Sequence, residues 1–147
     1  MKRQIFKSKI HRATVTGADL NYEGSITIDS ELLRAADILP YELVHVWDIT
    51  TGARFVTYAI AGGKDSGEIC VNGAGAKLCH VGDLIIIATF AEMTSNKARN
   101  WMPKVISVNE KNQIVKFAID IETLVIQPGI MSPTKLAVVN FSPIGSK

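Results

Sequence analysis

The sequence predicts a mainly β protein with short decorating helices. Three observations carry this prediction. The apolar segments are short and rich in β-branched residues, and glycine or polar turns separate them. A third is that the only two helical patterns are short. At 147 residues with 47% hydrophobic content, the chain is long enough for one domain with a proper core. The pattern leaves a barrel and a sandwich equally open.

The expected strands are bounded by turn sequences such as TTG, GGKDSG and NEKN. They cover residues 5–16, 24–28, 42–50, 53–61, 67–72, 83–93 and 105–109, with a C-terminal set around IVKFAI and KLAVVNF. One helix is expected over SELLRAAD, because Asp29 can cap its first free amides. A second is expected near residues 94–100, opened by Thr94 or Ser95.

The texture of the chain changes from about Gln127. Four residues interrupt the apolar runs there: Pro128, Gly129, Pro133 and Pro143. We therefore expect a main body over residues 1–115, followed by a C-terminal strand and an extended tail of the same domain over residues 116–147.

The charge and hydropathy of the chain exclude several classes of protein. Sixteen basic and fourteen acidic residues leave a net charge of +2 with no basic run, which is a poor footprint for nucleic acid. The longest apolar run is LIIIATFA, far below the roughly 20 residues of a membrane helix. The N-terminus lacks the apolar region of a signal peptide. We expect a cytoplasmic protein with no membrane or nucleic-acid partner.

Motifs for metals and external cofactors are missing from the sequence. Cys70 and Cys79 have no CxxC spacing and no second pair, so they do not form a zinc or redox motif and are expected to be buried free thiols. Catalytic Ser-His-Asp spacing, a phosphate loop and a dinucleotide fingerprint are also missing. The sequence therefore predicts neither a metal nor an external cofactor.

Several polar residues on predicted strands are candidates for a site. Lys9 and His11 share a strand face, and within RFVTY the side chains of Arg54 and Tyr58 point away from Thr57. Each has an ordinary explanation as a solvated, packed or ion-paired residue. The same holds for Trp47 as a core aromatic residue and for Asn72-Gly73 as a hairpin turn. Individually, these residues do not indicate a function.

Together, four stretches resemble the aspartate 1-decarboxylase family of pyruvoyl enzymes, from near residue 4 to about residue 108. They are KIHRATVTGADLNYEGSITID, ELLRAADI, VWDITTGARFVTYAI and VNGAGAKLCHVGDLIIIATFA. The motifs occur in the order and at the spacing of the family. Gly75 departs from the alanine usual in the family, and the stretch beyond about residue 115 is longer than in many members.

The resemblance implies a double-psi β-barrel that assembles as a homotetramer. It also implies self-cleavage between Gly24 and Ser25, assisted by Thr57, which gives chains 1–24 and 25–147 with a pyruvoyl group made from Ser25. A glycine carbonyl suits this attack because no Cβ blocks the approach. The activity implied is conversion of L-aspartate to β-alanine and CO2, for pantothenate biosynthesis. An accessory maturation factor is left open.

The resemblance also suggests roles for the other candidates. A guanidinium binds a carboxylate with two hydrogen bonds, so Arg54 is expected to hold the carboxylate that the substrate retains. Tyr58 is expected to donate the proton that replaces CO2. The remaining substrate-binding residues are Lys9 and His11 as positive potential, Trp47 as a wall, and Asn72 with the amides of Gly73, Ala74 and Gly75 as a cradle.

Two other readings stay open at this point. In an N-terminal-nucleophile hydrolase, the same cleavage would leave a free Ser25 amine as base and its hydroxyl as nucleophile. In a binding module, Gly24-Ser25 would be an intact turn.

Overall fold

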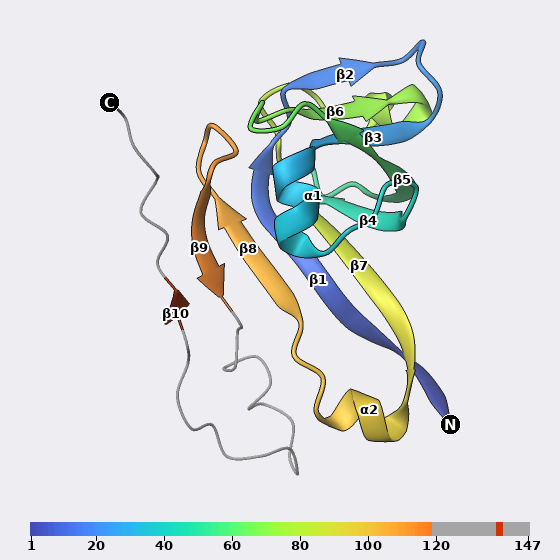
Figure 1. Cartoon of the computed structure of the whole chain (residues 1–147). Coiled ribbons are helices and arrows are strands. Elements are labelled where there is room, and N and C mark those ends of the chain that lie inside the picture. Colours follow the sequence, from blue (N-terminus) through green and yellow to red (C-terminus); the bar gives the residue numbers. More distant parts are fainter. Residues whose placement is uncertain (119–137, 140–147) are drawn as a thin grey trace.

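The computed structural model describes residues 1–118 and 138–139, and in these residues the chain is mainly β (Figure 1). The strands are β1 (Lys2–Thr14), β2 (Gly17–Asp19), β3 (Ser25–Asp29), β4 (Leu43–Asp48), β5 (Arg54–Gly62), β6 (Ile69–Asn72), β7 (Leu84–Thr94), β8 (Lys104–Val108), β9 (Ile114–Ala118) and β10 (Val138–Val139). The helices are α1 (Ser30–Ala36), η1 (Gly73–Lys77) and α2 (Ser95–Arg99). The predicted fold class is confirmed. Apart from Val138–Val139, the predicted tail beyond residue 118 lies outside the described residues.

The sheet is organised around the long strand β1. It pairs antiparallel with β7 on one side and parallel with β8 on the other, and β4 and β5 continue the sheet beyond β7. At the far end, β3 runs parallel to β5 and antiparallel to β6, and β2 runs parallel to β6. This interleaving of parallel and antiparallel pairs agrees with the predicted double-psi β-barrel. Figure 1 shows β2, β3 and β6 at one end and α2 at the other.

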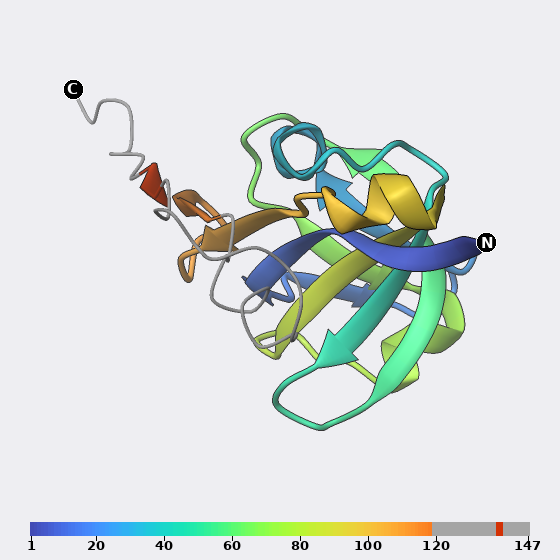
Figure 2. The ribbon, with the colours of Figure 1, turned by 90° about the horizontal axis from the view of Figure 1, so that it is seen from below.

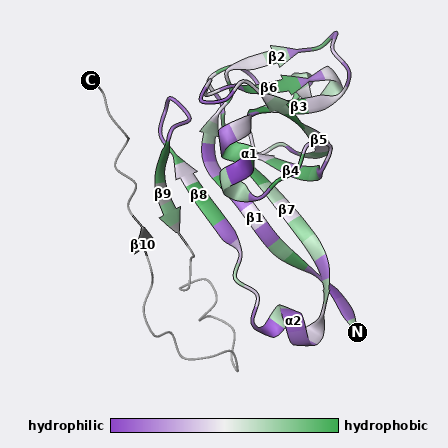
Figure 3. Cartoon of the chain, in the orientation of Figure 1, coloured by the Kyte–Doolittle hydropathy of each residue, from purple (hydrophilic) through white to green (hydrophobic). Residues whose placement is uncertain are grey.

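One apolar core fills the space that the strands surround (Figure 2). Its members alternate along the strands with outward-facing residues, as the period of two requires. The fully buried aliphatic residues include Ile10, Ile26, Ile28, Val44, Val46, Ile69, Val71, Ile85, Ile87 and Ile106. In Figure 3, β6 and β8 are largely hydrophobic, whereas the N-terminal end of β1 is hydrophilic. Each fully buried side chain of this kind stabilises the fold by roughly 1.5–3 kcal/mol.

The two predicted helices are confirmed, with the predicted residues at their starts. The carboxylate of Asp29 accepts a hydrogen bond from the Glu31 amide at 2.9 Å, and the Thr94 hydroxyl accepts one from the Lys97 amide at 3.3 Å. Asp29 also accepts from the amides of Asp65 and Gly67, so one buried carboxylate joins α1 to a distant loop. None of the helices in the described ranges is long and apolar enough to span a bilayer.

The structure differs from the sequence-based expectations at four places: β2, η1, Asn72-Gly73 and Cys70. The short strand β2 and the 3-10 helix η1 were not predicted, and Asn72-Gly73 opens η1 rather than a hairpin. Both cysteines are free and Cys79 is buried as expected, but Cys70 is only partly buried. The reason is its position on β6 opposite Gly17, which has no side chain to cover it.

Candidate functional site

Ser25 is the first residue of β3, and its side chain is held by two hydrogen bonds. The residue is 1% exposed. Its hydroxyl donates to the Glu23 carbonyl at 3.1 Å and accepts from Nδ2 of Asn72 at 3.0 Å. A hydroxyl with both its proton and a lone pair engaged has a defined direction. The candidate nucleophile is therefore ordered before any reaction.

The side chain of Asn72 makes three hydrogen bonds. It lies directly opposite Ser25 in the antiparallel β3–β6 pair and is 5% exposed. Its Nδ2 donates to Ser25 and also to the Thr27 hydroxyl, at 3.0 Å in each case, and its Oδ1 accepts from the Cys70 thiol at 3.3 Å. Asn72 therefore contacts Ser25 directly, next to the candidate scissile bond. The predicted cradle role did not include this contact.

Gly73 packs against the backbone of Gly24. It adopts φ +68°, and a Cβ on Gly73 would lie 2.7 Å from Cα of Gly24 and 2.8 Å from its nitrogen. Real Cβ atoms do not approach backbone so closely, so only glycine fits. Gly24 itself is open, with nothing within 4 Å of an added Cβ. Gly73 therefore approaches the Cα and nitrogen of Gly24 closely, and Gly24 has no side chain of its own beside its carbonyl.

Two more predicted residues stand next to the start of the β3–β5 ladder. Its first pair is Ile26 with Ala59; Gly24 and Ser25 come just before Ile26 in the chain, and Thr57 and Tyr58 come just before Ala59. Thr57 faces the core side, since it pairs with the buried Val44 on β4. The predicted opposition of Thr57 and Tyr58 follows from this pairing. The hydrogen bonds of Ser25 within the described residues go to Glu23 and Asn72, not to Thr57.

Arg54 and Trp47 form a second group on the outer face of the sheet. They pair across β4 and β5, and the guanidinium carbon of Arg54 lies 4.9 Å from the centroid of the Trp47 ring. This cation–π contact leaves the edge of the guanidinium available for a carboxylate. Arg54 is exposed. Arg54, Val56 and Tyr58 are each two residues apart on β5, so Tyr58 lies on the same face of the strand as Arg54.

Lys9 and His11 lie on the outer face of β1, with the buried Ile10 between them facing the core. Lys9 pairs with Ala88 on β7, which in turn pairs with His45 on β4, so this face continues toward Trp47. Burial lowers the pKa of His11, and the positive charges of Lys9 and Arg12 lower it further. In the single chain His11 is therefore neutral near pH 7, so the predicted positive potential comes from Lys9 rather than from His11.

The Nδ1 atom of His11 is buried and has no hydrogen-bond partner in the described part of the chain. A buried unpaired imidazole nitrogen is costly unless something outside the chain satisfies it. Nδ1 of His11 can therefore make one hydrogen bond to a polar group outside the described chain.

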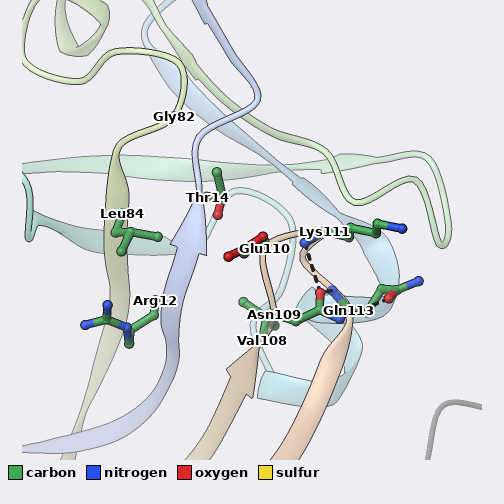
Figure 4. A pocket seen from close by; sticks show the side chains of 9 residues that line it. All are labelled: Arg12, Thr14, Gly82, Leu84, Val108, Asn109, Glu110, Lys111 and Gln113. Carbon is green, nitrogen blue, oxygen red and sulfur yellow. Dashed lines mark hydrogen bonds between the residues drawn. The ribbon is translucent and has the colours of Figure 1, made fainter.

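The structure does not bring all predicted residues into one pocket. Among residues 1–118 and 138–139, no hydrogen bond or ring contact joins Lys9, Trp47 or Arg54 to Ser25. A groove of about 890 Å³ lies elsewhere, between the β8–β9 turn and the ends of β1 and β7 (Figure 4). Its lining residues are Arg12, Thr14, Gly82, Leu84, Val108, Asn109, Glu110, Lys111 and Gln113, none of which was predicted to act in the site.

Gly75, where this chain departs from the family pattern, has a steric explanation. A Cβ at this position would lie 2.9 Å from the ring of Phe55 and 3.0 Å from a methyl group of Val71. Phe55 packs against the core from β5. Gly75 therefore accommodates the neighbouring aromatic ring.

Three groups that touch Ser25 or Asn72 were not predicted from the sequence: the Glu23 carbonyl, Thr27 and Cys70. Ser25 and Thr27 are two residues apart on β3, and Cys70 and Asn72 are two residues apart on β6. Each pair therefore shares a face of its strand. Ser25 lies opposite Asn72, and Thr27 lies opposite Cys70. The period-two spacing was visible in the sequence, but the pairing of the two strands was not.

Comparison with known proteins identifies the family. A family model described as aspartate decarboxylase matches residues 1–115, the part that contains Ser25 and Asn72. This chain belongs to the aspartate decarboxylase family. Three similar curated relatives are all named aspartate 1-decarboxylase, and this chain covers most of the length of each.

The relative from Syntrophotalea carbinolica is 59% identical over 112 residues, or 76% of this chain and 86% of that protein. The one from Myxococcus xanthus is 58% identical, over 78% of this chain and 88% of that protein. The one from Thermoanaerobacter pseudethanolicus is 59% identical, over 78% and 98%. Among solved structures, a computationally designed protein, msDPBB_sym2, matches 58% of this chain and 96% of its own, at 15% identity and a TM-score of 0.36, which is too distant to bear on the fold.

The polar groups around Ser25 are uncharged. In the residues that the structure describes, no three histidine, cysteine, aspartate or glutamate side chains are grouped as a metal site. The polar groups nearest to Ser25 are a carbonyl, an amide and a hydroxyl.

Proposed function

We propose that this member of the aspartate decarboxylase family converts L-aspartate to β-alanine and CO2, with a pyruvoyl group made from Ser25 by self-cleavage after Gly24. One observation supports the proposal above all. Ser25 is buried and oriented by two hydrogen bonds, and it lies directly after an unobstructed glycine. This arrangement is unusual for a turn serine and is what an intramolecular attack needs.

The chain's own residues can carry out the first step. The Ser25 hydroxyl oxygen bonds to the Gly24 carbonyl carbon, the bond to the Ser25 nitrogen breaks, and the hydroxyl proton passes to that nitrogen. A neutral serine needs help in this step. Thr57 comes two residues before Ala59, the partner of Ile26, and Gly24 comes two residues before Ile26, which supports a role for the Thr57 hydroxyl beside the carbonyl under attack. This step exchanges the peptide bond for an ester and leaves the chain joined. Loss of the Cα proton of residue 25 and cleavage of its Cβ–Oγ bond then release residues 1–24 as a carboxylate. Water hydrolyses the dehydroalanine left at the start of residues 25–147, with loss of ammonia, which gives the pyruvoyl group.

Residues 24 and 25 fit a serine-derived group, because Gly24 adds no side chain and the neighbouring side chain of Asn72 is a hydrogen-bond donor. Such a group would supply a carbonyl that captures the substrate amine and withdraws the electrons released with CO2. Arg54 then holds the retained carboxylate, with Trp47 stacked behind its guanidinium. Tyr58, which precedes Ala59 as Ser25 precedes Ile26, then donates the proton that replaces CO2.

The proposal includes a homotetramer, in the cytoplasm. Three apolar side chains are exposed on the same sheet face as Arg54: Leu43 at 57%, Val56 at 52% and Phe90 at 37%. Exposed apolar groups that gather on one face mark interaction surfaces. A second copy packed on this face would cover them and would bring its own Lys9, His11, Trp47 and Arg54 close to Ser25, which the single chain does not do.

The test is the intact mass of the full chain under denaturing conditions, with Ser25→Ala as the control. We expect one fragment ending at Gly24 and a second that is one ammonia lighter than a chain starting with serine, together with conversion of aspartate to β-alanine. Ser25→Ala should stay folded, uncleaved and inactive, since a small residue there costs little stability. A long fragment that keeps its serine nitrogen would favour the hydrolase. An uncut and inactive wild type, also after warming and with cell extract as a source of a maturation factor, would favour a binding module.

A further inference from the structure

We propose that Cys70 is a positioning residue for self-cleavage: its thiol sets the orientation of the Asn72 side-chain amide, so that the amide NH2 faces Ser25. The inference rests on the proposed function. Cys70 does not contact the reacting atoms, and it acts through Asn72.

The geometry comes from two cross-strand pairs on one face of the β3–β6 ladder. Ser25 lies opposite Asn72, and Thr27 lies opposite Cys70. The Cys70 sulfur is 3.3 Å from Oδ1 of Asn72, while Nδ2 of Asn72 is 3.0 Å from each of the two hydroxyl oxygens. Both amide hydrogens and the amide oxygen are therefore engaged within a patch of four residues.

The thiol helps to distinguish the two ends of the amide. The Thr27 hydroxyl can donate or accept, so it would tolerate either the oxygen or the nitrogen of Asn72. The Ser25 hydroxyl would have to give up its hydrogen bond to the Glu23 carbonyl before it could donate to Oδ1. A thiol donates to oxygen and cannot pair well with an NH2 group, which has only donors to offer and meets a weak acceptor in sulfur. Turning the amide over would therefore lose the hydrogen bond to Cys70. Oδ1 is held on the side of Cys70, and Nδ2 on the side of Ser25.

Two further features keep this thiol in place and protonated. Gly17 pairs with Cys70, and a Cβ on Gly17 would come within 2.9 Å of the sulfur, so the missing side chain leaves the room that the sulfur occupies. Burial raises the pKa of the Cys70 thiol, and the negative charges of Glu68 and Asp19 raise it further. The group therefore remains a donor at neutral pH.

The orientation matters most after the peptide bond has been exchanged for an ester. A base removes the Cα proton of residue 25, the Cβ–Oγ bond breaks, and Oγ leaves with the electron pair as part of the Gly24 carboxylate. Negative charge arrives on the atom to which Nδ2 of Asn72 donates. With the amide turned over, Oδ1 would face the same oxygen and repel it. The correct orientation therefore lowers the barrier to elimination.

The experiment follows maturation of the full chain from the moment of synthesis, by cell-free translation and intact mass at successive times. It compares wild type, Cys70→Ser, which keeps a donor, and Cys70→Ala, which removes it. We expect Cys70→Ala to mature roughly three- to tenfold more slowly, the rate equivalent of one neutral hydrogen bond. Cys70→Ser should stay within about twofold of wild type. Cys79→Val, which removes the other thiol away from Asn72, should mature at the wild-type rate.

The proposal is overturned if Cys70→Ala matures as fast as wild type. It is also overturned if Cys70→Ser is as slow as Cys70→Ala, because the sulfur would then matter for packing and not as a donor. If Cys70→Ala does not fold by circular dichroism, Cys70→Val decides. This change keeps an apolar side chain of similar size on the strand and removes the donor, and maturation at the wild-type rate would overturn the proposal. A wild type that never cleaves removes the proposed function itself, which is a separate result.

Discussion

Gly73 is in contact with the backbone of the residue whose carbonyl is expected to be attacked. Replacing it with alanine should impair self-cleavage, because the new Cβ would meet Cα of Gly24 at 2.7 Å and neither backbone can yield cheaply. The positive φ of Gly73 adds a strain of about 1–2 kcal/mol for alanine. We expect both a lower melting temperature and a large loss of cleavage, measured by intact mass.

Gly52 provides the matched control for that change. It also has a positive φ, at +79°, but nothing lies within 4 Å of an added Cβ. Gly52→Ala should therefore lose only the stability that a positive φ costs alanine, and should still cleave like wild type. Equal cleavage in the two variants would show that the Gly73–Gly24 approach has no part in the reaction.

Arg54 provides a second test at the residue scale. Arg54→Ala should lower kcat/KM for aspartate by roughly 10- to 100-fold, the equivalent of a charge-assisted hydrogen-bonded pair, and leave self-cleavage nearly intact. Steady-state kinetics and intact mass measure the two effects. The control is Arg34→Ala, because Arg34 is an exposed arginine on α1 whose ion pair is with Glu31 on the same helix. Unchanged kinetics in Arg54→Ala would remove Arg54 from the substrate site.

At the scale of elements, one side chain attaches the β8–β9 turn to β1. Asn112 is buried, and its amide both accepts from the Thr14 nitrogen and donates to the Thr14 carbonyl, at 2.8 Å each, in the manner of a neighbouring strand. It also donates to the Gly67 carbonyl at 2.8 Å. The backbone of Asn112 has φ +57°, which asparagine tolerates better than most residues.

Asn112→Ala should destabilise the fold by about 2–4 kcal/mol, because it leaves three backbone groups without their partner and strains the backbone. Urea unfolding measures the change. Asn112→Gly should lose less, since glycine adopts the positive φ freely, and the difference between the variants isolates the backbone strain. Lys111→Ala changes an exposed neighbour and should leave the free energy of unfolding nearly unchanged. If it loses as much stability as Asn112→Ala, the turn as a whole stabilises the fold and the Asn112 amide does not.

At the scale of the whole molecule, the exposed apolar sheet face predicts assembly. Val56→Glu places a charge at the centre of that face and should shift the protein from a tetramer to a smaller species, measured by size exclusion with light scattering. Val81→Glu is the matched control, because Val81 is 65% exposed in the loop before β7 and away from this face. A wild type that is monomeric, or an intact tetramer in Val56→Glu, would contradict the prediction.

The second prediction for the whole molecule concerns alkaline pH. Burial, together with the hydrogen bond and charge of Asp48 and the charge of Asp83, raises the pKa of the Cys79 thiol to about 12, from 9.0. The folded chain thus keeps a proton that the unfolded chain releases, so this stability is complete below about pH 9 and is lost as pH rises toward about 12.

Between about pH 8 and about pH 10.5, the free energy of unfolding should fall less in Cys79→Val than in wild type. The difference between the two falls should be on the order of 1 to 2 kcal/mol. Urea unfolding at both pH values gives the comparison, and Cys70 remains in both proteins and contributes to each. If the two proteins lose stability in parallel, the Cys79 thiol is not the group that titrates.

Much of this protein follows from local patterns. Alternation of apolar residues predicted nearly every strand, and Asp29 and Thr94 predicted where the two α-helices begin, because these signals depend on neighbours within a few residues. The motif around Gly24-Ser25, the RFVTY stretch and the VNGAGA stretch indicated the family and named Ser25, Arg54 and Asn72 as candidates. These were properties of the sequence alone.

Tertiary structure decided which of these residues meet. The pairing of β3 with β6 joins positions 47 residues apart, Ser25 and Asn72, and adds Thr27 and Cys70 to the site. Gly73 acquired its reason only from the backbone of Gly24, and His11 proved neutral only once its burial was known. Short elements such as β2 and η1 are held by tertiary contacts and not by propensity. Sequence determines local preferences, but hydrogen bonds, close approaches and desolvation between distant segments depend on the register in which the strands pair.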